Sequence, residues 1–195
     1  ARIMQQGDTF RMNIGDTKPY NADFDGDGAI DTLMEKYIST VDGRSLPKTI
    51  PGKVYDSLVA FTFHTQPVCL LIDPNNKLDT LEISNVNQQF GLAYLKNEGD
   101  LNGDGIDEIS FVVDWADWSN TNTCYVYSYI DGKWEKIYSF SIFDSQLPNY
   151  RSIANMNSFK GLIEKLDNDT IIISTRNRET GALRKKVWDL NFPQH

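Results

Sequence analysis

Two short acidic turns, both rich in glycine, hold the residues of this chain whose types and spacing could do chemistry. Loop 1 (residues 23–31) reads DFDGDGAID, and loop 2 (residues 100–108) reads DLNGDGIDE. Carboxylates packed this closely repel one another, and the chain already has a formal net charge of -8. Since a cation among them would relieve that repulsion, the spacing predicts a metal site in each loop.

Aligned in register, the two loops offer oxygen ligands at positions one, three, five, seven and nine. Position seven contributes a backbone carbonyl and the other positions contribute side chains, a shell that favours Ca²⁺ over softer or more rigidly octahedral ions. Glycine at position six, which is Gly28 or Gly105, lets the chain turn sharply there. The predicted ligands are Asp23, Asp25, Asp27, Ala29 and Asp31 in loop 1, and Asp100, Asn102, Asp104, Ile106 and Glu108 in loop 2. Asp107 has no ligand role, and we expect it to point to solvent.

The spacing departs from that of a helix-loop-helix calcium site at the twelfth position. That position needs a bidentate Glu, but this chain has Met34 and Phe111, and the residues that follow alternate as in a strand. A phosphate-binding loop is excluded as well, because the acidic groups would repel a phosphate. Each loop is therefore expected to lead into a strand, with the ninth-position carboxylate closing the site.

The segments DFDGDGAIDTLM and DLNGDGIDEISFV resemble the calcium loops of FG-GAP and VCBS repeats, which occur in integrin-type β-propellers and in many bacterial surface proteins. The resemblance is limited to these two segments. It implies that positions one, three, five, seven and nine hold Ca²⁺ and that the protein is secreted or displayed on a bacterial cell surface. A full propeller of that family needs more blades than 195 residues supply, so the resemblance implies a short relative or another β fold.

The hydropathy pattern alternates with a period of two along most of the chain, which predicts strands. We expect a single all-β domain over residues 1–195, built from antiparallel meanders like propeller blades, with a β-sandwich as the alternative. Loop-plus-meander repeats are expected near residues 20–90 and 97–143. The pair Asp131-Gly132 predicts a tight hairpin, the apolar run 57–64 is read as a strand, and short helical turns are expected near residues 53–58 and 145–153.

Composition narrows the classes of partner. A sequence pI of about 4.7 argues against a nucleic-acid backbone as ligand, and the basic run Arg184, Lys185 and Lys186 is typical of a solvated edge strand. No stretch approaches the roughly 18 apolar residues of a membrane helix. Cys69 and Cys124 lack metal or dithiol spacing, which leaves two buried thiols or a disulfide.

Catalytic signals are weak, because the chain has two histidines and no recognised nucleophile or zinc-protease motif. We name no catalytic residue and lean against an enzyme. Trp115 and Trp118, three residues apart beside a polar loop, are candidate ligand-binding residues because amphipathic rings stack on sugars or anchor protein partners. The sequence favours a calcium-stabilised extracytoplasmic binding or adhesion module for a glycan or a protein. The alternatives are a carbohydrate-active hydrolytic domain that uses Asp and Glu residues, and a periplasmic inhibitor or partner protein.

Overall fold

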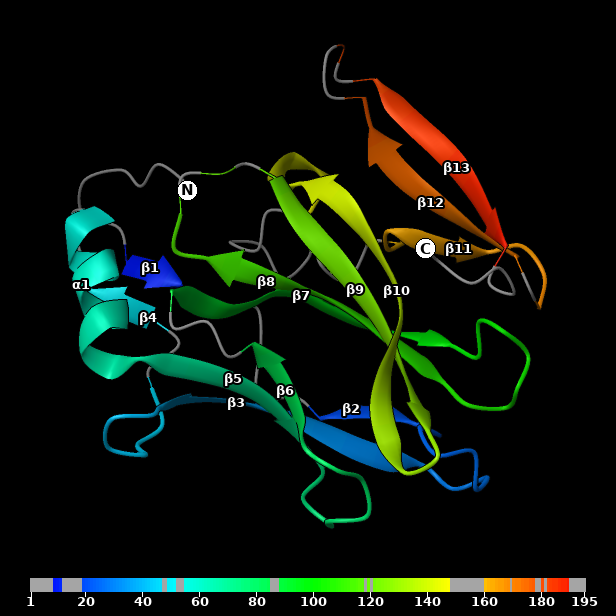
Figure 1. Ribbon diagram of the computed structural model, residues 1–195, viewed down its shortest axis with the longest axis horizontal. Coiled ribbons are helices and arrows are strands. Elements are labelled where there is room, and N and C mark those ends of the chain that lie inside the picture. The colour runs from blue at the N-terminus through cyan, green and yellow to red at the C-terminus, as the bar shows by residue number, and fades with distance from the viewer. Residues whose placement is uncertain are drawn as a thin grey trace. The chain divides into compact units, whose positions relative to one another are not determined.

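A computed structural model describes residues 9–11, 19–46, 49–51, 55–84, 88–117, 119, 121–147, 160–168, 170–177, 180 and 182–189. Strands make up most of these residues, and the sheets are antiparallel wherever the register is defined, as the alternating pattern predicts (Figure 1). The all-β class is confirmed at this level.

The elements follow the chain in a simple order. The strands are β1 (Thr9–Arg11), β2 (Tyr20–Ala22), β3 (Asp31–Ser39), β4 (Thr49–Pro51), β5 (Pro67–Ile72), β6 (Leu81–Ser84), β7 (Gln89–Gly99), β8 (Glu108–Trp115), β9 (Thr121–Ile130), β10 (Lys133–Phe143), β11 (Ile163–Lys165), β12 (Thr170–Arg176) and β13 (Leu183–Asp189). The described helices are α1 (Tyr55–Thr65) and the short 3-10 turn η1 (Asp144–Gln146). The turn η1 falls at the start of the region 145–153, where a helical turn was predicted.

Two four-stranded sheets have the same strand order relative to the acidic loops. One sheet runs β2-β3-β5-β6, and the other, read from its β7 edge, runs β7-β8-β9-β10. Loop 1 joins β2 to β3, and loop 2 joins β7 to β8, so each loop connects the first and second strands of its sheet. The described residues also form a two-stranded sheet of β1 and β4, and a three-stranded sheet in the order β11-β12-β13.

The hairpin between β9 and β10 confirms the turn predicted from Asp131-Gly132 (Figure 1). Ile130 pairs with Lys133 across the two-residue connection. Asp131 has φ 51° and Gly132 has φ 78°, as a type I′ turn requires at both central residues.

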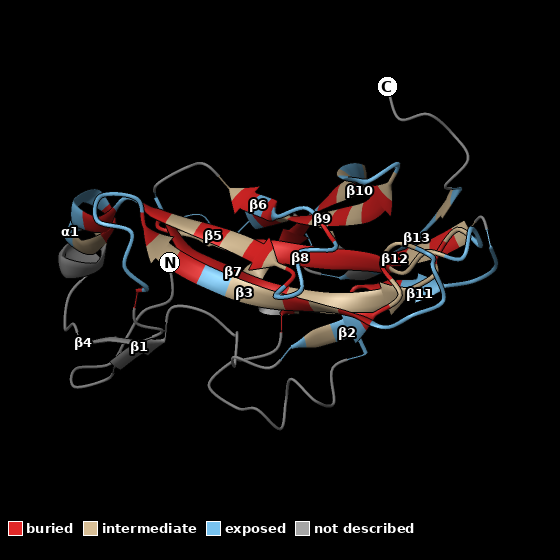
Figure 2. Ribbon diagram, turned by 90° about the horizontal axis from the view of Figure 1, so that it is seen from below, coloured by how far each residue is buried: buried red, intermediate tan, exposed pale blue. Residues whose placement is uncertain are grey.

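Burial separates central strands from edge strands. Along β8 the first six residues are all buried, as expected of a strand with both faces covered (Figure 2). Strand β13 lies at the edge of its sheet and leaves Arg184, Lys185 and Lys186 exposed, which confirms the solvated basic edge. Cys69 and Cys124 are buried free thiols, so the disulfide alternative is wrong.

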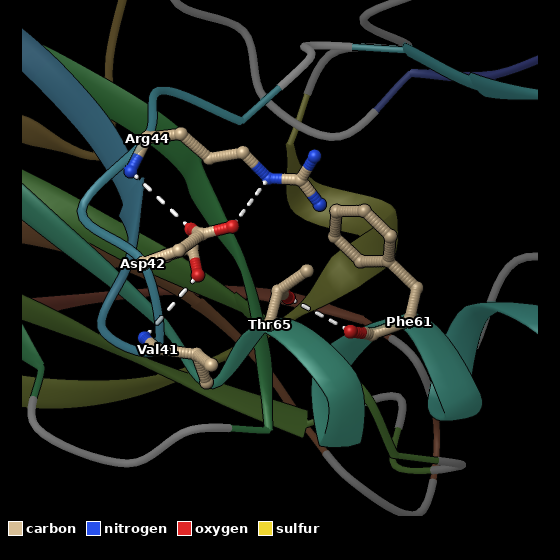
Figure 3. Close-up of polar contacts among 6 residues, drawn as sticks. Val41, Asp42, Arg44, Phe61 and Thr65 are labelled. Carbon is tan, nitrogen blue, oxygen red and sulfur yellow. Dashed lines mark hydrogen bonds and ion pairs between the residues drawn. The ribbon is translucent and has the colours of Figure 1, made fainter.

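Helix α1 corrects the prediction of a strand over residues 57–64. Thr62 and Thr65 are buried on α1, whereas Phe63 and His64 between them are exposed, a spacing of three that fits a helix and excludes alternation. The Thr65 hydroxyl donates to the Phe61 carbonyl at 2.7 Å (Figure 3). Short apolar runs do not distinguish helix from strand by periodicity alone, and this segment belongs to that class.

The chain divides into two compact units. The first comprises Ala1–Tyr20, Thr32–Leu95 and Phe111–Ser119, and the second comprises Asn21–Asp31, Lys96–Ser110 and Asn120–His195. In the first unit, Asp42 caps a tight turn by accepting the Arg44 backbone N–H at 3.3 Å and pairing with its guanidinium at 3.1 Å (Figure 3). Both acidic loops belong to the second unit.

Candidate metal centre

The two loops share three internal hydrogen bonds at equivalent positions, and in loop 2 the Gly103 N–H also donates to Asp100 Oδ1 at 2.5 Å. Position one accepts the backbone N–H of position six, position three accepts that of position five, and position five accepts that of position seven. In loop 1 the distances are 2.9 Å from Gly28 N to Asp23 Oδ2, 3.1 Å from Asp27 N to Asp25 Oδ1 and 2.7 Å from Ala29 N to Asp27 Oδ1. In loop 2 they are 3.1 Å from Gly105 N to Asp100 Oδ2, 3.0 Å from Asp104 N to Asn102 Oδ1 and 2.8 Å from Ile106 N to Asp104 Oδ1.

Glycines at positions four and six give both loops the same backbone path. The φ angles are 73° at Gly26 and 81° at Gly28, against 81° at Gly103 and 90° at Gly105. These angles lie in the left-handed region, where a side chain is costly. The requirement at position six was predicted from the sequence, and position four follows the same rule.

Position nine closes each loop from inside the protein. Asp31 is 3% exposed and accepts the Phe24 N–H at 3.0 Å, while Glu108 is 0% exposed and accepts the Leu101 N–H at 2.6 Å and the Ser128 hydroxyl at 2.9 Å. Burial raises the pKa of the Glu108 carboxyl to about 7, although these two hydrogen bonds act to lower it. A nearby cation would favour the ionised carboxylate.

The residue at position two anchors each loop in the core. Phe24 is 0% exposed and packs edge to face on Trp134, with ring centroids 5.8 Å apart. Leu101 takes the same place in loop 2 and is 1% exposed. Each loop is thereby held at both ends, by an apolar side chain at position two and by a buried carboxylate at position nine.

Loop 1 brings three carboxylates close enough to share a cation. Oxygens of Asp23, Asp25 and Asp27 lie within 4.8 Å of one another. Asp23 Oδ1 is buried and has no hydrogen-bond donor among the described residues. A buried carboxylate oxygen without a donor is costly unless a cation neutralises it. In loop 2 the middle carboxylate is replaced by the Asn102 amide, whose Nδ2 donates to Asp104 Oδ2 at 2.9 Å.

The loops contact each other, which their separation in the sequence did not reveal. The Asp107 N–H donates to the Asp23 carbonyl at 2.8 Å. A Cβ at Gly26 would lie 3.1 Å from Ile106 Cγ1, so the Ile106 side chain covers that glycine. Asp107 is half-buried and accepts a hydrogen bond from Asn97 Nδ2 at 3.4 Å, so the expectation that it points to solvent is wrong.

The turn between β11 and β12 lies against loop 2 and was also missed by the sequence. The Lys165 ammonium donates to the Asp100 carbonyl. A Cβ at Gly103 would lie 2.7 Å from Asn168 Cγ. The sequence carries no local signal of either contact, because both join segments that are far apart in the chain.

The candidate aromatic site is not assembled in the described residues. Trp115 lies at the end of β8 and is partly exposed. Trp118 lies outside the described residues. The pair of tryptophans therefore stays a prediction.

Comparison with known proteins yields one partial similarity. A family model described as RNA polymerase Rpb1, domain 2 matches residues 1–38. The match covers 38 of 195 residues, which is too little to show family membership, and it includes loop 1 but not loop 2. Searches of curated proteins and of solved structures gave no match. None of the described helical residues form a segment with the length and hydropathy of a membrane span.

Proposed function

We propose that this protein is a calcium-binding all-β module whose two loops hold structural Ca²⁺ ions. The observation that carries the proposal is the agreement between two loops from distant parts of the chain, in hydrogen bonds, in φ angles and in the burial of position nine. The buried Asp23 Oδ1, which lacks a donor among the described residues, supports a cation independently of that agreement. All-oxygen ligand sets of variable number favour Ca²⁺.

The ions are proposed to stabilise the fold. The ligands are the residues predicted at five positions of each loop. The residue at position nine is also the first residue of the following strand, which is β3 after loop 1 and β8 after loop 2. An ion held between position one and position nine would tie the end of one strand to the start of the next. Ca²⁺ therefore stabilises the native state by mass action.

The finer architecture is proposed to be two blade-like repeats. The shared strand order of the two four-stranded sheets supports this, because each repeat consists of a strand, an acidic loop and three further strands. In the first repeat, α1 and β4 lie between the second and third strands in sequence. A β-sandwich is the alternative arrangement.

The wider role is proposed to be extracytoplasmic binding or adhesion. A weak site such as that proposed for loop 2, which has three charged ligands, suits the millimolar Ca²⁺ found outside cells. A glycan or a protein is the proposed ligand. Of the two candidate tryptophans, Trp115 lies within the described part of the chain, and it is proposed to contact the ligand. If the protein binds to a glycan array and Trp115→Ala abolishes that binding, the result would support this role. If the protein instead hydrolyses a glycan, and an Asp→Asn change outside both loops abolishes the hydrolysis, the hydrolytic alternative would be favoured.

Calorimetric titration tests the metal sites directly. After treatment with a chelator, the wild-type protein should bind two Ca²⁺ ions per chain, and Asp27→Asn and Asp104→Asn should each bind one. Asp79→Asn is the matched control, since it makes the same chemical change in an exposed residue outside both loops. Absence of heat on titration, together with melting curves that coincide with and without chelator, would overturn the proposal.

A further inference from the structure

We propose that the turn between β11 and β12 makes the two calcium sites unequal, with Lys165 weakening loop 2 so that loop 1 fills first. This inference rests on the proposed calcium binding and deepens it, because it assigns an order of filling and one residue that sets it. Lys165 is the last residue of β11 and is not a predicted ligand.

The count of carboxylates already favours loop 1. Loop 1 places acidic side chains at positions one, three, five and nine, whereas loop 2 has the neutral Asn102 at position three. Affinity for Ca²⁺ in such loops rises with the number of charged ligands. Among the predicted ligands, loop 2 therefore has three acidic side chains against four in loop 1.

Lys165 adds a positive charge to the weaker loop. Its ammonium donates to the backbone carbonyl of Asp100, the residue whose carboxylate is the first predicted ligand. That carbonyl is not a predicted ligand, so the ammonium can stay in place while an ion binds. It then repels the incoming Ca²⁺ through space, and this repulsion is screened by salt.

A second contact holds the turn between β11 and β12 against loop 2, so that the Lys165 ammonium stays near the proposed ion. Gly103 at position four of loop 2 faces Asn168, and a Cβ there would lie 2.7 Å from Asn168 Cγ and 2.8 Å from its Cβ. The turn therefore approaches loop 2 at position one and at position four. At Ca²⁺ concentrations between the two dissociation constants, loop 1 would be occupied, and the occupancy of loop 2 would still change with the Ca²⁺ concentration.

The first test compares two single-site proteins by calorimetric titration with Ca²⁺. Asp104→Asn leaves loop 1 intact, and Asp27→Asn leaves loop 2 intact. Loop 1 should bind more tightly than loop 2. Lys165→Gln in the Asp27→Asn protein should then tighten loop 2 by a few-fold to about tenfold in low salt, and by less in high salt.

Two variants in the same background separate the charge of Lys165 from its packing. Lys165→Arg keeps the charge and should leave the affinity of loop 2 unchanged. Lys185→Gln removes the same charge from an exposed residue that pairs with Glu164 at 3.0 Å, and should change the affinity by less than twofold. A purely structural Lys165 would lower the melting temperature on substitution without tightening Ca²⁺ binding.

The outcomes distinguish this inference from the function on which it rests. If both single-site proteins bind Ca²⁺ but loop 1 is not tighter, or if Lys165→Gln does not tighten loop 2, the inference is overturned while calcium binding stands. If neither single-site protein nor the wild type binds Ca²⁺, both fail together.

Discussion

Replacing Glu108 with Gln should separate the stability of the fold from its response to calcium. Glu108 is fully buried and accepts hydrogen bonds from the Leu101 N–H at 2.6 Å and the Ser128 hydroxyl at 2.9 Å. Gln has the same shape, and its carbonyl can accept from Leu101. Its amide can donate to Ser128, whose hydroxyl rotates to accept. Both contacts survive the substitution, but a ligand charge is lost.

The magnitude follows from the burial of the carboxylate. Burial raises the pKa of Glu108 from 4.5 to about 7, and each unit is worth about 1.4 kcal/mol. At pH 8 without a cation, the buried charge costs about 3 kcal/mol, so Glu108→Gln should be at least as stable as the wild type and up to about 3 kcal/mol more stable. With Ca²⁺ at 100 times the dissociation constant, an intact loop 2 gains about 2.7 kcal/mol, and the variant gains almost none there.

Denaturant unfolding at pH 8, with chelator and with saturating Ca²⁺, measures both quantities. Ser128→Ala is the control, because it removes one hydrogen bond and keeps the carboxylate. It should lose about 1–3 kcal/mol in chelator, no more than that with Ca²⁺, and still bind two ions. The reasoning about loop 2 is refuted if Glu108→Gln keeps the full calcium response, or if it loses several kcal/mol in chelator.

Three further predictions concern residues outside the ligand set. Burial opposes ionisation of Asp73, but backbone N–H groups hold its pKa below the usual range; Asp73→Asn should lose about 1–3 kcal/mol at pH 7 with or without Ca²⁺, a deficit that shrinks as the pH falls below about 4 in urea melts. Phe24→Ala should cost about 3–5 kcal/mol and change the fluorescence of its neighbour Trp134. Cys69 and Cys124, whose pKa values are raised by burial, should react with iodoacetamide only after unfolding.

The sequence was informative wherever the signal is local. Period-two alternation predicted β9 and β10, and the Asp131-Gly132 pair fixed their turn, because the residues that determine a hairpin are adjacent. The ligand register was readable for the same reason, since nine consecutive residues carry it. The segment that forms helix α1 was predicted as a strand because a short run of apolar residues is compatible with both the helical and the strand period.

Contacts between segments that are far apart in the chain were not predicted from the sequence. Lys165 and Asp100 are 65 residues apart, and the Asp107 N–H donates to the Asp23 carbonyl across a still longer separation in the chain. No pattern within a window of the sequence encodes which turn folds back onto which loop. The sequence therefore predicted both metal sites but not the contact of Lys165, the residue that is proposed to make their Ca²⁺ affinities unequal.

A third turn, which begins at Asp73, shares part of the loop geometry without carboxylates at positions three and five. Asp73, which is 4% exposed, accepts the N–H of Leu78 five residues on at 3.2 Å, as position one does in both loops. Asn76 at position four has φ 57°, in the same left-handed region as the glycines there, but Leu78 at position six does not share the positive φ of Gly28 and Gly105. Positions three and five in this turn are Asn75 and Lys77.

The same hydrogen bond and a similar φ angle thus form with a neutral residue and a cation where loop 1 has Asp25 and Asp27. The backbone hydrogen bonds that Asp25 and Asp27 accept need a side-chain oxygen but not a charge, since the neutral Asn102 accepts the equivalent bond in loop 2 at 3.0 Å. The mutual repulsion of the two carboxylates works against the fold. A bound cation does account for them, because it turns that repulsion into ligand charge. On this reasoning the turn at Asp73 should show no calcium response, and removing the acids of loop 1 should matter to stability mainly when Ca²⁺ is present.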